Sequence, residues 1–140
     1  MATLTATTFA NVQPRNLPSR VISISGSFNS GATEISASAT TIFLCKIPNK
    51  ATILELIEHH TTGAGSCPVD YGIDGTLSAF ISQGTQAIVN RLSVGANIPY
   101  TVSLSDDAAV NYSILKATAT PGTGTASLKI GFTVMYTMDK

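Results

Sequence analysis

The sequence predicts an all-β protein, built as an antiparallel two-sheet sandwich of about eight strands. Small hydroxyl residues occupy 34 of the 140 positions, as 19 Thr and 15 Ser, and the β-branched Thr favours strands. Short alternating segments are separated at brief intervals by Gly, Pro, Asn and Asp turns, which is typical of a sandwich. The length fits one domain with a substantial core.

Residues 1–20 are expected to form an extended N-terminal arm, and residues 21–140 the sandwich domain. The first segment has no sustained period, and Pro14 and Pro18 disfavour both a helix and a central strand. Such an arm either frays or becomes ordered across a neighbouring subunit. No basic residue precedes Arg15 and no apolar run is long enough for a signal peptide or a membrane span, so a soluble, non-secreted protein is expected.

The first strands of the domain are recognised by alternation that stops at turn residues. Residues 21–25 alternate, and Gly26 together with residues 29–31 is expected to supply the turn that follows. A weak strand of small residues is expected over 32–39. A stronger strand over 41–46 ends at the Ile-Pro-Asn-Lys turn of residues 47–50.

Residues 51–60 fit two patterns. Ile53, Leu54, Leu56 and Ile57 suit the apolar stripe of a helix, whereas alternate positions of the same segment suit a strand. Ten residues make a marginal helix, and both flanks are strands with turns. A strand is therefore predicted here.

The second half of the chain contains further turn-bounded apolar segments. The expected strands are residues 69–73, 77–81, 86–92, 99–104, 110–120 and 128–138. Residues 86–92 also fit one or two helical turns, and Asp74-Gly75 is a hairpin-type pair. The last strand has the clearest pattern, because its even-numbered residues are apolar and its odd-numbered ones are polar or Gly, apart from Met135.

The histidines and cysteines do not predict a metal site. Neighbouring residues on a strand point to opposite faces, so His59 and His60 are poorly placed to share one metal ion. A surface pair at a strand end is the favoured interpretation. Cys45 and Cys67 lack CxxC spacing and are expected to be buried thiols rather than a disulfide.

The sequence does not predict an enzyme. Asp70 with Asp74, or Asp106 with Asp107, have the composition of general acid–base pairs, but turn chemistry explains them better. Neither a nucleophile elbow nor a phosphate-binding fingerprint is present, so no catalytic residue, metal or cofactor is expected. Eight basic and eight acidic residues are scattered along the chain, which argues against nucleic acid or a membrane as the partner.

Residues 40–136 resemble the head decoration (cement) proteins of tailed bacteriophages. The similar features are the Lys-Ile-Pro-x-x-Ala-x-Ile corner of residues 46–53, the strand that ends at His60, and the Gly loop of residues 63–65. The Val-Asp-Tyr-Gly-Ile-Asp-Gly strand at 69–75 and the closing alternation at 124–136 complete the resemblance.

This resemblance implies a jelly-roll that binds the outer surface of a phage head and clamps neighbouring major capsid subunits. The implied partners are the major capsid protein and other copies of the chain, as a homodimer or otherwise a trimer. Arg15, Leu17 and Arg20 are expected at the interface because of their position in the arm. The protein is expected to be made in the host cytoplasm. Alternatives are a phage fibre or carbohydrate-binding sandwich and a self-assembling shell or pilin-like subunit.

Overall fold

The protein is an all-β sandwich of two sheets. The computed structural model describes residues 2–6, 9, 20–31, 39–63, 65, 67–73, 76–84, 88–92, 100–102, 111–121 and 127–138. In chain order the strands are β1 (Ala2–Thr5), β2 (Val21–Asn29), β3 (Thr40–Pro48), β4 (Ala51–Thr62), β5 (Val69–Ile73), β6 (Thr76–Gly84), β7 (Val89–Leu92), β8 (Tyr100–Thr101), β9 (Tyr112–Ala119) and β10 (Leu128–Met138).

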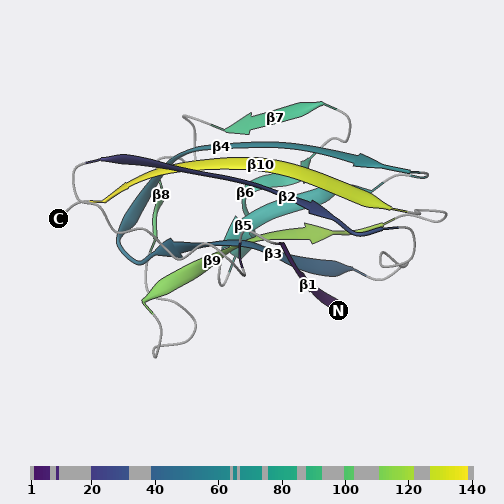
Figure 1. Cartoon of the computed structure of the whole chain (residues 1–140), viewed down its shortest axis with the longest axis horizontal. Helices are drawn as coiled ribbons and strands as arrows, with labels where there is room; N and C mark the ends of the chain where they lie inside the picture. Colours follow the sequence, from purple (N-terminus) through teal and green to yellow (C-terminus); the bar gives the residue numbers. More distant parts are fainter. Residues whose placement is uncertain are drawn as a thin grey trace.

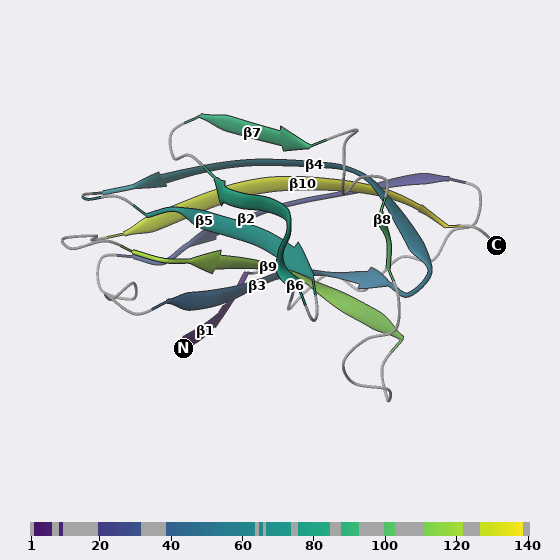
Figure 2. The same cartoon turned by 180° about the vertical axis from the view of Figure 1, so that it is seen from behind.

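The two sheets lie one above the other (Figures 1 and 2). One has the order β2-β10-β4-β7, with β8 also paired to β4, and the other has the order β1-β3-β9-β5-β6. All neighbouring strands are antiparallel except β1, which runs parallel to β3. The sequence predicted about eight strands, and the described residues contain ten; β1 is the one that lies outside the segments predicted as strands.

The strand pairs are nested along the chain. Strand β2 pairs with β10, β3 with β9, β4 with β7, and β5 with β6. The arrangement is that of one long hairpin rolled into two sheets, which is consistent with the jelly-roll expectation. Each paired strand thus contributes apolar side chains to one shared interior.

The interior is filled mainly by branched aliphatic residues from both sheets. In β10 the even-numbered residues from Leu128 to Met138 are buried, as the alternation predicted. The largest side chains with almost no exposed surface are Tyr71, Tyr136, Ile42, Leu44, Ile47, Ile53, Leu56, Ile73, Leu115, Leu128 and Ile130. Full burial of each aliphatic side chain is worth about 1.5–3 kcal/mol.

Segment 51–60 is a strand, as predicted, and a β-bulge explains its helix-like pattern. Met135 of β10 pairs with Glu55, whereas the next residue, Tyr136, pairs with Ile53, so Leu54 is an extra residue. The bulge moves the inward-facing positions of β4 from odd to even numbers. Ile53 and Leu56 therefore both face the interior although three positions separate them.

Strand β3 contains a second bulge, with the same effect on its apolar run. Phe43 pairs with Lys116 and Cys45 pairs with Leu115, which leaves Leu44 without an opposite residue. Leu44 and Cys45 are consequently both buried, although they are neighbours in the chain.

The start of the predicted arm belongs to a sheet of its own chain. Strand β1 pairs in parallel with residues 40–43 of β3, and the backbone N–H of Ala6 donates to the carbonyl of Phe43. The ring of Phe9 lies 5.4 Å from that of Phe43, and the ammonium group of Lys46 lies 5.0 Å from the Phe9 ring centre. These contacts concern residues 2–6 and 9 only, so the domain boundary at residue 20 stays a prediction.

Several local predictions are corrected or lie outside the described part of the chain. Gly26 lies inside β2 rather than in a turn, because that strand continues to Asn29. Residues 89–92 form a strand paired with β4, so the helical-turn alternative is wrong for them. The weak strand predicted over 32–39 falls almost wholly outside the described residues.

Candidate functional site: the outer face of the β2-β10-β4-β7 sheet

The predicted interface residues are only partly within the described chain. Arg20 is exposed immediately before β2, whereas Arg15 and Leu17 lie outside the described residues. Their role at an interface therefore stays a prediction. Among the described residues, the candidate site lies elsewhere, on the outward-facing side of the β2-β10-β4-β7 sheet.

This outer face is rich in hydroxyl groups. Ser23, Ser25 and Ser27 of β2 all point outward and are exposed. The Ser25 and Thr133 hydroxyl oxygens lie 2.8 Å apart across β2 and β10, and those of Thr52 and another outward residue, Thr101, lie 3.4 Å apart. Such cross-strand pairs stabilise the sheet while leaving a polar, largely uncharged surface.

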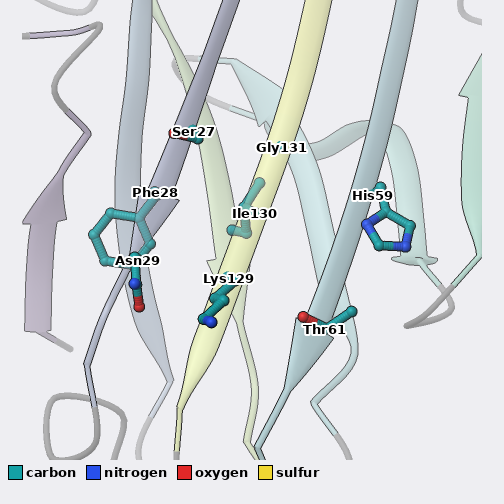
Figure 3. Close-up of a pocket in the computed structure, with 8 residues that line it drawn as sticks. All are labelled: Ser27, Phe28, Asn29, His59, Thr61, Lys129, Ile130 and Gly131. Atoms are coloured by element: carbon teal, nitrogen blue, oxygen red, sulfur yellow. The ribbon is translucent and has the colours of Figure 1, made fainter.

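A hollow crosses this face above Gly131 of β10. Figure 3 shows Gly131 between Ser27 of β2 and His59 of β4, and strand register places both residues directly opposite it. A Cβ atom added to Gly131 would meet no other atom within 4 Å. The hollow is therefore the space that a side chain at position 131 would occupy, and the side chains of Ser27 and His59 lie on either side of it.

The hollow has a polar part and an apolar part, which meet at His59 and Gly131. The polar part has a volume of about 440 Å³. Its lining residues are Ser27, Phe28, Asn29, His59, Thr61, Lys129, Ile130 and Gly131. The second part has a volume of about 330 Å³ and is lined by Gly26, Ile57, Glu58, His59, Val89, Gly131, Phe132 and Thr133. Together these residues define the Gly131 groove.

The charged groups on this face are few. Lys129 is exposed at the polar end of the groove, and no acidic residue lines that end in the described part of the chain. Further along the sheet, Arg91 of β7 forms an ion pair with Glu55 of β4 at 2.9 Å. The polar end of the groove therefore offers hydrogen-bond donors and a positive charge.

Beneath the same sheet lies a buried polar cluster centred on Glu58. Its Oε2 atom accepts a hydrogen bond from the Tyr71 hydroxyl at 2.5 Å and lies 2.9 Å from Nδ1 of His60. Its Oε1 atom accepts from the amide of Asn90. Gly84 leaves room for the carboxyl group, because a Cβ there would come within 3.2 Å of Oε1.

The cluster corrects the interpretation of His59 and His60 as a surface pair. His59 is exposed, but His60 has no exposed surface, because the bulge in β4 turns even-numbered residues inward. Opposite faces for the two rings were expected and are confirmed. The sequence signal for the cluster was two polar residues, Glu58 and His60, at alternate positions of a strand.

The chemistry of the cluster is structural. Glu58, His60 and Tyr71 have no exposed surface, so a substrate does not reach them in the folded protein. Burial, followed by the nearby Glu58 carboxyl, raises the pKa of Tyr71 well above its ordinary value. Tyr71 thus remains a protonated donor to Glu58, which satisfies a polar group that is costly to bury alone.

The remaining candidate groups carry no site in the described residues. Cys45 and Cys67 are buried thiols that form no disulfide, as predicted, and burial raises the pKa of each. Asp70 is half-buried on β5, while Asp74, Asp106 and Asp107 lie outside the described residues. Within the described chain, no three His, Cys, Asp or Glu side chains gather to hold a metal ion. The same residues contain no helix with the length and apolarity to cross a membrane.

Two solved structures contain chains that are similar to this one. A chain of "Cyanophage Pam1 capsid asymmetric unit" matches over 94% of this chain and 97% of its own length, with a TM-score of 0.63 and 17% identity. A chain of "Capsid of Ralstonia phage GP4" matches over 99% of both chains, with a TM-score of 0.67 and 17% identity. This likeness shows a common fold along almost the whole chain. Neither a protein-family model nor a curated protein matches the sequence.

Proposed function

We propose that this protein is a non-enzymatic structural component of a phage virion. It binds the outer surface of the head as a decoration protein and clamps neighbouring major capsid subunits. The observation that carries the proposal is the likeness to chains in two phage capsid structures. In each match at least 94% of this chain and at least 97% of the other chain are covered. Because the match leaves little of either chain uncovered, the shared unit is the entire sandwich rather than a common submodule.

The physical character of the sandwich supports this role. A clamp works as a rigid body, and the two sheets of the sandwich pack on one continuous apolar core in the described residues. Equal numbers of basic and acidic residues make binding weakly dependent on salt. A hydroxyl-rich face supports hydrogen-bonded, hydrated contacts.

Assembly explains how weak contacts suffice. A homodimer that engages two capsid subunits raises the effective concentration of the second contact, so the pair binds more tightly than either half. Binding that is specific for the assembled shell stabilises that shell by mass action. In this proposal, Arg15, Leu17 and Arg20 of the predicted arm contribute to the capsid contact.

The experiment uses particles produced with and without this protein. Particles that lack it are expected to release their DNA at a lower temperature, and addition of the purified protein is expected to restore the higher temperature. Cryo-electron microscopy of complete particles is expected to locate the sandwich outside the shell, between capsid subunits. Equal heat resistance of both particle types, together with no density on the outer surface, would contradict the proposal.

The carbohydrate-binding alternative gains no support from the described aromatic residues. Ligand sites usually present apolar or aromatic surface to the ligand. Tyr71 and Tyr136 are fully buried, Tyr100 and Tyr112 are half-buried, and the chain has no Trp. The two phenylalanines that line the Gly131 groove, Phe28 and Phe132, are both buried in the described chain.

A further inference from the structure

We propose that the Gly131 groove receives an acidic side chain, followed by an apolar one, from an extended segment of the major capsid subunit. This inference rests on the proposed function and assigns the contact to one place on the sandwich. The groove is thus a second contact surface, in addition to the arm residues expected at the interface from the sequence.

The first argument is that Gly131 has no structural reason to be glycine. Glycine within a strand costs about 0.5–1 kcal/mol relative to Ala, and it often marks a close approach by a ligand or another chain. Gly72 and Gly84 are explained by nearby backbone atoms, and Gly31 by its positive φ of 73°. Gly131 has open space around it and no left-handed φ. The empty space above it is therefore the feature that glycine provides.

The second argument is charge complementarity at the polar end. Lys129 supplies an ammonium group there, with Ser27, Asn29 and Thr61 as additional polar partners. No acidic residue lines this polar end in the described chain, and Glu58, which lines the apolar end, is buried and accepts hydrogen bonds from Tyr71 and Asn90. A carboxylate is the complement, since it accepts hydrogen bonds from ammonium, hydroxyl and amide donors.

The third argument is the exposed apolar surface at the other end. Val89 is 63% exposed and its neighbour Ile88 is 54% exposed, although large aliphatic residues are usually buried. Val89 lies beside His59 in the register, and Ile57 is one outward position further along β4. Successive outward positions on a strand are about 6.6–6.8 Å apart, which is also the spacing of alternate residues in an extended partner.

A protein segment fits this groove better than a small molecule. Small-molecule sites generally enclose 70–90% of the ligand surface, whereas this groove lies open along the outward side of one sheet (Figure 3). An extended segment keeps one side in solvent or against its own subunit while alternate side chains enter the groove.

The test measures binding of the full-length protein to purified heads that lack it. Gly131→Leu places a large side chain in the groove, at a position where an added Cβ meets no atom within 4 Å, and Lys129→Glu reverses the charge at the polar end. Each is expected to weaken binding at least about tenfold, the size of a 1.4 kcal/mol loss. Thr137→Leu is the matched control, since it adds the same side chain to the same face of β10, six residues away, and is expected to bind like the wild type. Circular dichroism verifies that all three variants are folded.

The outcomes separate this inference from the proposed function. Failure of the wild type to bind heads would overturn both. If the wild type binds and Gly131→Leu and Lys129→Glu bind equally well, the groove assignment is wrong and the decoration role stands. If Thr137→Leu weakens binding as much as Gly131→Leu, the contact covers the face without using the groove, which also overturns the assignment. Loss confined to the two groove variants supports it.

Discussion

Replacement of Tyr71 by Phe tests the buried cluster with a single hydroxyl group. The change keeps the ring in the core and removes the donor that lies 2.5 Å from Glu58 Oε2. A hydrogen bond to a charged group contributes about 1.5–3 kcal/mol to stability. Because Glu58 has no exposed surface, water does not replace the lost donor, and the upper part of that range is expected.

The expected loss is large enough to measure by thermal unfolding. Unfolding entropies of roughly 2.1 cal/mol/K per residue give about 0.3 kcal/mol/K for 140 residues. A loss of about 1.5–3 kcal/mol therefore lowers Tm by about 5–10 °C. Urea unfolding followed by far-UV circular dichroism gives the free energy directly.

The pH dependence gives this prediction a second, independent readout. Folding raises the pKa of Tyr71, so its stabilising contribution is complete below the unfolded pKa of about 10 and is lost as pH rises above it. The wild type then loses about 1.4 kcal/mol per pH unit through this residue, whereas Tyr71→Phe does not. The stability gap between the two proteins is expected to be constant up to about pH 9 and to shrink above pH 10.

Tyr112→Phe is the control, because Tyr112 is half-buried and its ring lies 5.2 Å from the ammonium group of Lys46 on the neighbouring strand β3. Its stability is expected to change by less than about 0.5 kcal/mol. A Tyr71→Phe protein as stable as the wild type at pH 7, or a gap that stays constant to pH 11, would refute the reasoning about the cluster.

Three further predictions concern the backbone and the thiols. Gly72→Ala is expected to cost at least about 3 kcal/mol in urea unfolding, because its Cβ would lie 2.2 Å from a backbone carbonyl oxygen of β6; wild-type stability would contradict this. Deletion of Leu54 is expected to leave a folded protein, at a cost of about 1–2 kcal/mol by circular dichroism, because the bulge residue has no partner in β10. Deletion of Ile57 is expected to prevent folding, because it turns each following residue of β4 to the other face of the sheet. A Leu54 deletion that is less stable than the Ile57 deletion would contradict this account. Cys45 and Cys67 are expected to react with a thiol reagent only after unfolding, because burial raises the pKa of both; rapid labelling of native protein would disprove it.

The fold was predictable where side chains alternate without interruption. Every even-numbered residue of β10 faces the core, as the sequence indicates, and β5 has the predicted bounds. The helix-like pattern of residues 53–57 arose because a bulge places Ile53 and Leu56 on the same face. A bulge depends on pairing with a distant strand, which local periodicity does not contain.

The candidate site was less predictable for the same reason. Alternation correctly placed Gly131 on the polar side of its strand, but its neighbours Ser27 and His59 come from strands far away in the chain. Likewise, the sequence offered no signal that Asn90 and Tyr71 approach Glu58. These contacts follow from the order of strands in the sheets, and several orders are compatible with the same turns and alternation.

The nested order of strands has a consequence for biosynthesis. Ser25 and Thr133, which share a hydrogen bond, are 108 positions apart, and β2 acquires its sheet neighbour only when β10 is available. During translation the ribosome therefore releases a long stretch of chain before the outermost pair is able to close. Until then the edges of the unfinished sheets are open to other nascent copies, so chaperone capacity is expected to limit the yield at high expression rates.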